Sequence, residues 1–408
     1  MKRHISKELL QAERLAKQME SEELVTPLRL LLVLIISVAL VTAVSFSAAN
    51  TSDYLLSSSD ETINLTTVPY IYDYLKAEKT REENMEFYNQ PLDQWTVEKR
   101  SRLSLDEFWD IYDGKWPVII TDVVDKWPAI NWTKPFFLQN YADEKVMVKA
   151  VVNSKPAAVA VNMDTFISEL DTSGPNGWTY LEDELFIVTR PELKKDIGPN
   201  VYAEENFFNL FPDEVRPWDC LMLWGSQFSR SSLHMDPYNW TATNAVLYGH
   251  KSWMLFPPGQ DELLYIYPNR KCHFPLDCVR YDSPIDAYQP DSTKYPNFDK
   301  AQYLEVTVSA GEMLIIPTGW YHQAFNEVET LAISSQIMNR NNYLAVLEEI
   351  IKGGNINRKK LPAYFNTLLP PDQVKLFLSL LHKKILKKGK EVTEGVLKDM
   401  HRKKVLNI

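Results

Sequence analysis

The stretch Ser231–Pro258, SSLHMDPYNWTATNAVLYGHKSWMLFPP, holds a histidine and an aspartate two residues apart, followed by two apolar runs on either side of Gly249. On a β-strand, residues i and i+2 point to the same face, so His234 and Asp236 can reach one common point. A neutral imidazole and a carboxylate at one point form half of a metal site. An isolated pair of this kind is more often an inert, hydrogen-bonded strand end, so the rest of the chain must decide.

Short apolar runs recur along the chain, and Gly, Pro, Asn and Asp turns separate them. Strands are expected in WPVIITDVV, VKAVVN, GWTYLED, DCLMLW, TNAVLYG, KSWMLFPP, LEVTVSAGEMLIIP and TLAISSQIM. Many short strands without intervening helices favour a barrel or a double-sheet jelly roll over a parallel α/β sheet.

Segments of helical period flank this region. LSLDEFWDIY forms an amphipathic pattern with Ser104 as its N-cap. After Asn342 the period returns in YLAVLEEIIKGG and in PPDQVKLFLSLLHKKILKKG, which we expect to be one helix ending at Gly389. The predicted class is therefore mainly β with flanking α-helices and a C-terminal helical extension at residues 346–408.

The N-terminal part contains a long apolar segment with no charged residue between Leu30 and Ser52. About 20 apolar residues are enough for a helix to cross a bilayer. A signal peptide would begin with a short positive region, whereas 29 residues of mixed charge come first here. A buried core helix would show a polar stripe. We therefore expect a cytosolic tail at residues 1–28, a transmembrane signal anchor at 29–49 and a stem at 50–100.

Flanking charge predicts the orientation of this anchor. Six lysines and arginines precede it, whereas Asp53, Asp60 and Glu61 are the first charged residues after it. Because the positive flank stays in the cytosol, we expect a single-pass type II protein with its catalytic domain in the lumen of the endoplasmic reticulum or Golgi.

Two further features fit a lumenal address without proving it. Four N-x-Ser/Thr sequons lie on that side, at Asn50, Asn64, Asn131 and Asn239, and predict a glycoprotein. Cys272 and Cys278 could close a short disulfide loop and leave Cys220 free, but the sequence leaves this pairing open.

The third candidate ligand is His322, in GEMLIIPTGWYHQAFN, where it follows a hydrophobic run, a Pro-Thr-Gly turn and two aromatic residues. Two histidines and one carboxylate, with the other coordination positions open, form the facial triad of non-haem Fe(II) oxygenases. A zinc hydrolase can use the same three ligands. The triad alone therefore does not decide the chemistry.

Lys251 separates these alternatives. It lies seventeen residues after His234, just beyond the Gly249 turn, on a mostly apolar run. A lysine in such a place is costly unless an anion pairs with it. 2-Oxoglutarate would chelate iron through its keto-acid end, and its distal carboxylate needs a buried cation. We therefore expect Fe(II), 2-oxoglutarate and O2 to share the site.

In order and spacing, SSLHMDP, NAVLYGHKSW and GWYH resemble the motifs of Jumonji-C oxygenases, which have the cupin (double-stranded β-helix) fold. The chain is most similar to the arginine demethylase and lysyl-hydroxylase group, once called phosphatidylserine receptor. The similarity covers about residues 101–345 and implies a cupin jelly roll there. The anchor, stem and C-terminal extension lie outside it.

The resemblance also implies roles for single residues. His234, Asp236 and His322 match the catalytic iron ligands, and Lys251 matches the residue that pairs with the distal carboxylate. The other matched positions are co-substrate contacts: Asn244, Ser231, Ser334 and, by a looser alignment, Tyr180. Ser231 stands where the family usually has threonine, and Ser334 likewise replaces one hydroxyl residue by another.

We thus expect a dioxygenase that hydroxylates, or by hydroxylation demethylates, a protein side chain. A catalytically silent cupin that binds a glycan or peptide, and a zinc-dependent cupin hydrolase, are the alternatives. The net charge of −10 argues against nucleic acid as a partner. A protein substrate of the secretory pathway is expected. The apolar face of the C-terminal helices predicts either packing on the jelly roll or a homodimer, which the resemblance favours.

Overall fold

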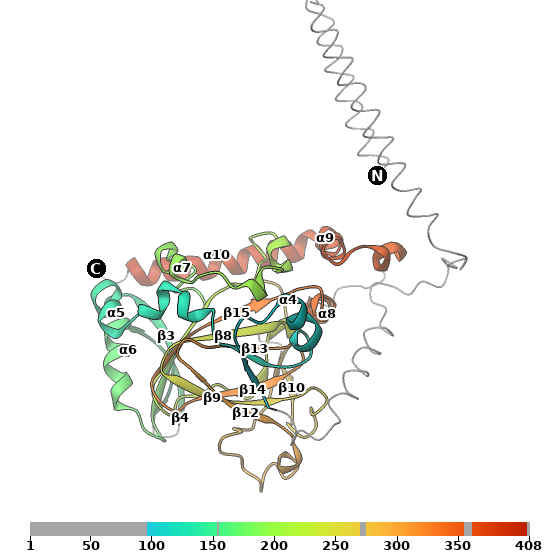
Figure 1. Ribbon diagram of the computed structural model, residues 1–408. Coiled ribbons are helices and arrows are strands. Elements are labelled where there is room, and N and C mark those ends of the chain that lie inside the picture. The colour runs from blue at the N-terminus through green and yellow to red at the C-terminus, as the bar shows by residue number, and fades with distance from the viewer. Residues whose placement is uncertain (1–95, 153–154, 270–274, 355–360, 406–408) are drawn as a thin grey trace, which may run out of the picture. The chain divides into compact units, whose positions relative to one another are not determined.

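The strands form two sheets (Figure 1) in a computed structural model that describes residues 96–152, 155–269, 275–354 and 361–405. The large sheet has the order β1-β2-β13-β8-β15-β6-β5-β3-β4 and the small sheet the order β10-β11-β7-β14-β9-β12. The bounds are β1 Glu98–Arg100, β2 Val118–Ile120, β3 Lys145–Val152, β4 Lys155–Asn162, β5 Trp178–Asp183, β6 Leu221–Gly225, β7 His234–Met235, β8 Thr241–Tyr248, β9 His250–Phe256, β10 Tyr267–Asn269, β11 Arg280–Asp282, β12 Leu304–Ser309, β13 Met313–Ile316, β14 Tyr321–Asn326 and β15 Thr330–Ile337. The predicted mainly β jelly roll with flanking helices is confirmed.

Two glycine turns carry the chain from one sheet to the other. Gly249 joins β8 of the large sheet to β9 of the small sheet, with φ +76°. Gly311 lies between β12 of the small sheet and β13 of the large sheet, with φ +87°. This left-handed conformation is readily adopted by glycine. The two turns thus place consecutive strands in opposite sheets.

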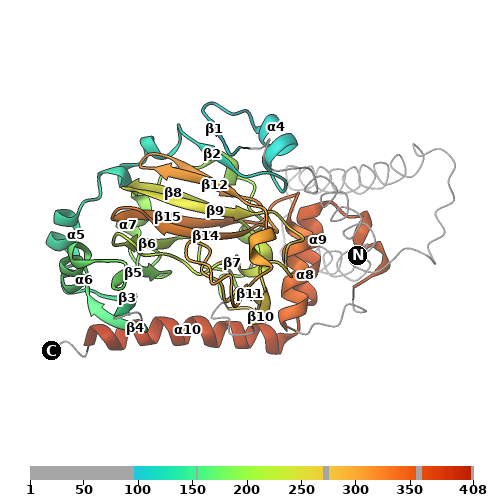
Figure 2. The same cartoon turned by 90° about the horizontal axis from the view of Figure 1, so that it is seen from below.

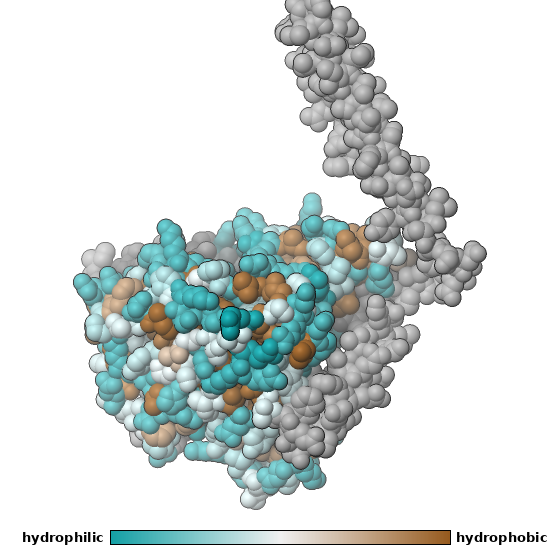
Figure 3. Space-filling view, in the orientation of Figure 1, coloured by the Kyte–Doolittle hydropathy of each residue, from teal (hydrophilic) through white to brown (hydrophobic). Residues whose placement is uncertain are grey.

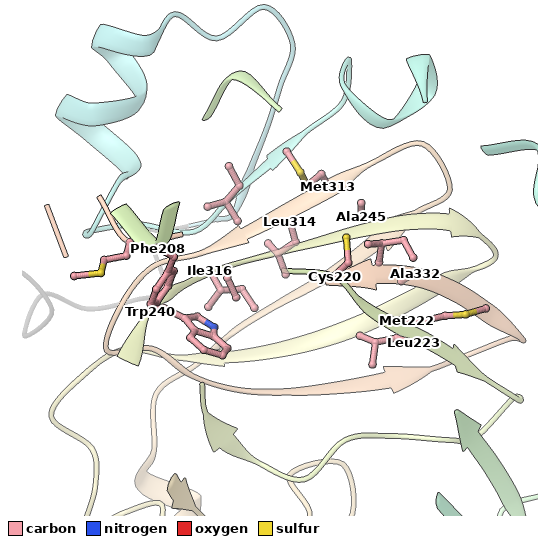
Figure 4. Close-up of a cluster of buried hydrophobic side chains, with 14 of the residues drawn as sticks. Phe208, Cys220, Met222, Leu223, Trp240, Ala245, Met313, Leu314, Ile316 and Ala332 are labelled. Carbon is pink, nitrogen blue, oxygen red and sulfur yellow. The ribbon is translucent and has the colours of Figure 1, made fainter. Parts of the chain in front are cut away.

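Two cores hold the sheets in place. The larger one covers the outer face of the large sheet, where Met222, Ala245 and Met313 lie (Figure 4), and it also extends between the sheets to Trp253 and Leu255 of β9. The smaller core lies on the outer face of the small sheet, under the segment 257–303. Its buried residues are Leu233, Met235, Met254, Phe256, Leu264, Ile285, Ala287, Phe298 and Tyr321. Both outer faces are thus covered, and between the sheets the buried polar side chains Lys251 and Asn244 lie among apolar ones.

The helices lie around the sheets. Their bounds are α4 Leu105–Glu107, continued by a π-helical turn at Phe108–Tyr112, α5 Lys134–Tyr141, α6 Met163–Glu169, α7 Pro191–Asp196, α8 Tyr343–Gly354, α9 Pro370–Leu380 and α10 Lys383–Val405. In both views α5 and α6 lie at one end of the domain and α8 and α9 at the other, and α10 runs between these ends (Figures 1 and 2). The predicted Ser104 cap is present, since its hydroxyl accepts the Glu107 N–H at 3.2 Å.

The C-terminal helices differ from the expectation in one respect. The expected single helix ending at Gly389 is wrong, because the helix is interrupted at Leu381 and Gly389 lies inside α10. A Cβ on Gly389 would lie 2.5 Å from Val215 Cγ1 and 2.8 Å from the Pro275 oxygen. The glycine therefore permits a close approach of the helix to the domain instead of ending it.

The N-terminal expectations are largely outside the described residues. The expected anchor at 29–49, the sequons Asn50 and Asn64, and most of the stem belong to this part. β1, at the end of the expected stem, pairs in parallel with β2 and so belongs to the large sheet. Among the residues that the structure describes, none forms a helix long and apolar enough to span a membrane. The face of the domain seen in Figure 3 is largely hydrophilic, with small scattered apolar groups.

Candidate metal centre

Strand register brings the candidate residues of the small sheet to one face. His322 on β14 pairs directly with His234 on β7 and with Leu255 on β9. Lys251 and Trp253 lie four and two residues before Leu255, so alternation along the strand places all three side chains on this face. Asn326 on β14, the cross-strand partner of Lys251, also lies there.

The large sheet turns its own candidates toward this face. Ser334 pairs with Asn244, and Tyr180 pairs with Gly225 across β5 and β6. A Cβ built on Gly225 would lie 2.2 Å from Asn326 Nδ2 of the small sheet and 2.5 Å from Tyr180 Cδ2. The inner faces of the two sheets therefore meet at Gly225. All predicted site residues in the two sheets lie on these inner faces.

The three expected metal ligands come together. One ligand atom from each of His234, Asp236 and His322 can be chosen so that all lie within 4.8 Å of one another. The nearest Asp236 oxygen is 3.6 Å from His234 Nε2 and 3.8 Å from His322 Nε2. The Nδ1 atoms donate to backbone carbonyls, that of His234 to Ser232 at 2.8 Å and that of His322 to Trp320 at 3.3 Å. Each Nε2 lone pair is thereby directed toward the common point.

The protonation states of His322 and Asp236 also suit a cation. Burial lowers the pKa of His322 to about 4, so its ring is neutral at pH 7. Burial alone would raise the pKa of Asp236, but His322, His234 and a hydrogen bond from Trp240 hold it below its ordinary value. Burial alone would lower the pKa of His234, but the neighbouring Asp236 carboxylate raises it, so a metal would have to replace a proton on this ring. The site thus presents a carboxylate that favours positive charge nearby.

Lys251 lies deeper in the fold than its position beside a turn suggests. Its side chain is 0 % exposed, and within the described residues its Nζ has no hydrogen-bond partner. The ammonium lies 5.6 Å from the centre of the Trp253 ring and 5.9 Å from that of Tyr180. Burial lowers the pKa of Lys251 to about 7. An unpaired amine in such a place is costly unless a ligand supplies an anion.

The remaining predicted contacts are present with different degrees of support. Ser231 accepts the Ala324 N–H at 3.0 Å, and a hydroxyl that accepts a bond can still donate its own proton. Among described atoms, Asn244 Oδ1 is buried without a partner. Ser334, directly opposite, is half-buried. Tyr180 is buried beside Lys251.

Trp253 is a site residue that the sequence analysis missed. Its ring centre is 5.8 Å from that of His322, so it lies between the metal ligands and Lys251. Its indole Nε1 is buried and finds no acceptor among the described residues. A buried indole N–H usually has a partner, so this donor is also available to a ligand. The alternation that selected Asp236 after His234 would have selected Trp253 after Lys251.

The comparisons with known proteins agree with this geometry. A model of the cupin-like domain family matches residues 104–342, more than half of the chain. The chain is 29% identical over 269 residues to the lysine-specific demethylase JMJ21 of Arabidopsis thaliana, covering 64% of this chain and 27% of the relative. It is 25% identical to the bifunctional arginine demethylase and lysyl-hydroxylase psr-1 of Caenorhabditis elegans, over 62% of this chain and 63% of the relative. It is 31% identical to the 2-oxoglutarate and iron-dependent oxygenase JMJD4 of Danio rerio, over 41% of this chain and 38% of the relative. The chain thus spans less than two thirds of these curated relatives.

Proposed function

Since this chain belongs to the cupin-like domain family, we propose that it is an Fe(II)- and 2-oxoglutarate-dependent dioxygenase that hydroxylates a side chain of a protein. The relatives support this proposal, since one is named a 2-oxoglutarate and iron-dependent oxygenase and others are named demethylases or a lysyl-hydroxylase. Hydroxylation of an N-methyl carbon followed by loss of formaldehyde is a demethylation, so both outcomes belong to one reaction class.

The observation that carries the proposal is the Nζ of Lys251, which is buried without a hydrogen-bond partner among the described residues and lies on the same inner face as His322. A zinc hydrolase needs no buried cation beyond its metal ligands. A dicarboxylate that binds the metal at one end gives Lys251 the anion that its burial requires. The residues therefore fit 2-oxoglutarate as well as the metal.

The protein's own groups would bind, orient and exclude water. His234, Asp236 and His322 supply three ligands and leave further coordination positions open. Lys251 and Asn244 on the inner faces, together with Ser231 just before the first ligand, would fix the co-substrate. Fe(II), when bound, supplies the redox chemistry by which O2 oxidises 2-oxoglutarate to succinate and CO2 and hydroxylates a C–H bond, with one oxygen atom of O2 entering each of succinate and the hydroxylated product. The buried surroundings of Lys251 strengthen its attraction for a carboxylate, because water does not screen it.

The test separates these roles by substitution. His234→Ala or Asp236→Ala should lose metal binding and succinate formation together. Lys251→Ala should keep the metal but bind 2-oxoglutarate about 10²-fold more weakly or worse, because a lost buried charge partner costs about 2–5 kcal/mol. Lys375→Ala, an exposed lysine on α9, is the matched control. Calorimetric titration of metal and of 2-oxoglutarate into the full-length variants measures both affinities. Normal 2-oxoglutarate binding by the Lys251 variant would contradict the proposal.

We further propose that the chain is a single-pass type II membrane protein, with the apolar segment at 29–49 as anchor and the catalytic domain in the lumen. The charge asymmetry around this segment supports the orientation. Cys278 is disulfide-bonded, which is typical of an oxidising compartment, while Cys220 is free; the expected partner, Cys272, lies outside the described residues. Of the described sequons, Asn131 is exposed and suits a glycan. Protease added to intact microsomes should trim only the N-terminal tail, and digestion of the catalytic domain in sealed vesicles would refute this topology.

We also propose that the substrates are proteins of the secretory pathway and that the chain forms a homodimer through its C-terminal helices. The lumenal address supports the first proposal. Exposed leucines on and beside α9, Leu369 and Leu380, support the second.

A further inference from the structure

The segment Asp236–Thr241 forms an irregular turn immediately after the carboxylate ligand. Tyr238 and Asn239 both have a left-handed backbone, with φ +54° and +53°. Asparagine adopts this conformation more readily than most residues, whereas tyrosine does so at a cost. Two such residues in succession persist only when surrounding contacts hold them. The contacts of Asn239 therefore decide what this turn does.

Asn239 connects the two chain segments that bear the metal ligands. Its Oδ1 accepts the Gly319 N–H, and its backbone oxygen accepts the Thr318 hydroxyl at 2.5 Å. Gly319 lies three residues before His322, and Asn239 three residues after Asp236. These two hydrogen bonds thus join the Asp236 turn directly to the turn that leads into His322.

The next two residues hold the same turn from other sides. The Trp240 side chain donates a hydrogen bond to the Asp236 carboxylate. Thr241 is buried, and its hydroxyl accepts the Asn342 side-chain amide at 3.0 Å. All three residues of this sequon are therefore engaged in the fold around the ligands, which gives the Asn239-Trp240-Thr241 triplet a structural reason that does not involve a glycan.

We propose that Asn239 is a positioning residue of the metal centre, which fixes Asp236 relative to His322 through its bonds to Thr318 and Gly319. This inference rests on the metal site of the proposed function, but not on its oxygen chemistry. The ligand atoms of Asp236 and His322 come from segments far apart in the sequence, so their spacing depends on contacts between the segments. Loss of the side-chain acceptor lets the two turns move apart and weakens the metal site.

Three substitutions at Asn239 separate its contributions. Asn239→Gly keeps the left-handed backbone but removes the acceptor, and Asn239→Ala removes the acceptor and strains the backbone. Asn239→Asp keeps an acceptor oxygen in the same place and, like the other two, abolishes the sequon. Loss of a group that orients metal ligands typically weakens metal binding by about 10–100-fold. We expect this loss for the Gly and Ala variants and a change of less than about threefold for the Asp variant.

The probe is Co(II), titrated into the purified full-length chain, with its visible absorption bands reporting the coordination. A residue that merely stabilises the fold would lower the melting temperature without changing the Co(II) affinity of the folded protein. Wild-type affinity in a folded Gly variant would overturn the proposal, as would an Asp variant as weak as the Gly variant. His234→Ala tests the premise separately: unchanged Co(II) binding there would mean that the triad is not the metal site.

Discussion

At the scale of residues, the protonation of Lys251 makes 2-oxoglutarate binding depend on pH. Burial lowers the pKa of the free lysine to about 7, and a bound carboxylate raises it again, since it favours the charged form. Above pH 7, binding must therefore take up a proton, and the affinity should fall by about tenfold per pH unit until the pKa of the complex is reached. Below pH 7 the lysine is already charged and the affinity should level off. Calorimetry in buffers of different ionisation enthalpy measures this proton uptake.

Lys251→Arg is the control for this prediction. A guanidinium stays charged throughout this pH range, so any 2-oxoglutarate binding that the variant retains should be independent of pH. If the wild-type chain took up no proton at about pH 8.5, the lysine would already be charged without its ligand. The burial of Lys251 would then no longer support a dicarboxylate as its partner.

The sequence predicted the site residues whose geometry is local. His234 and Asp236 lie on one strand end, and alternation alone aims both at one point. The same alternation places Trp253 on the face of Lys251, but Trp253 carries no charge that would mark it as a candidate. The meeting of Asn244 and Ser334 depends on the pairing of β8 with β15, which are far apart in sequence. Periodicity within each strand contains no information on that register, and only the family resemblance suggested these two residues.

At the scale of elements, the two glycine turns between the sheets differ in their surroundings. Both have positive φ, but a Cβ on Gly249 would lie 2.1 Å from the Glu329 oxygen, whereas one on Gly311 would have no described atom within 4 Å other than those of its chain neighbours. Gly311→Ala should therefore cost only the left-handed strain, about 1 kcal/mol of unfolding free energy. Gly249→Ala adds a backbone clash and should cost about 3 kcal/mol or more. Denaturant unfolding of both variants measures the difference, and equal costs would contradict the close approach at Gly249.

Most strands in the apolar runs were predictable, but some element boundaries were not. The break between α9 and α10 has no glycine or proline to announce it. Leu381 leaves the helical conformation and is buried, and the His382 ring accepts the Lys384 N–H at 3.1 Å, which caps the next helix. Tertiary burial of one leucine thus ends a helix that local propensity would continue. The β4 strand was missed because its run, PAAVAV, begins with proline and contains three alanines.

At the scale of the whole molecule, the C-terminal helices serve the chain's own core and still leave apolar surface. Phe377 on α9 is 2 % exposed and belongs to the larger core, so the expected packing on the jelly roll is observed. Leu380 on the same helix is 40 % exposed, and Leu369, just before it, is 71 % exposed. The proposed homodimer would cover these two leucines. Stability and dimerisation should therefore depend on different residues of one short element.

Phe377→Ala should cost about 3–5 kcal/mol of unfolding free energy, because it empties a filled part of the core. The double variant Leu369→Glu/Leu380→Glu should change stability by less than about 1 kcal/mol, because both side chains already contact solvent. If these leucines form the dimer interface, the same variant should be monomeric, since the charges cannot be buried there without partners. Light scattering measures the molar mass of the purified full-length wild-type chain and of the variants. Phe377→Ala is measured at a temperature at which it remains folded. A wild-type chain that is monomeric at all accessible concentrations would refute the dimer. A double variant that still dimerises would show that these leucines do not form the interface.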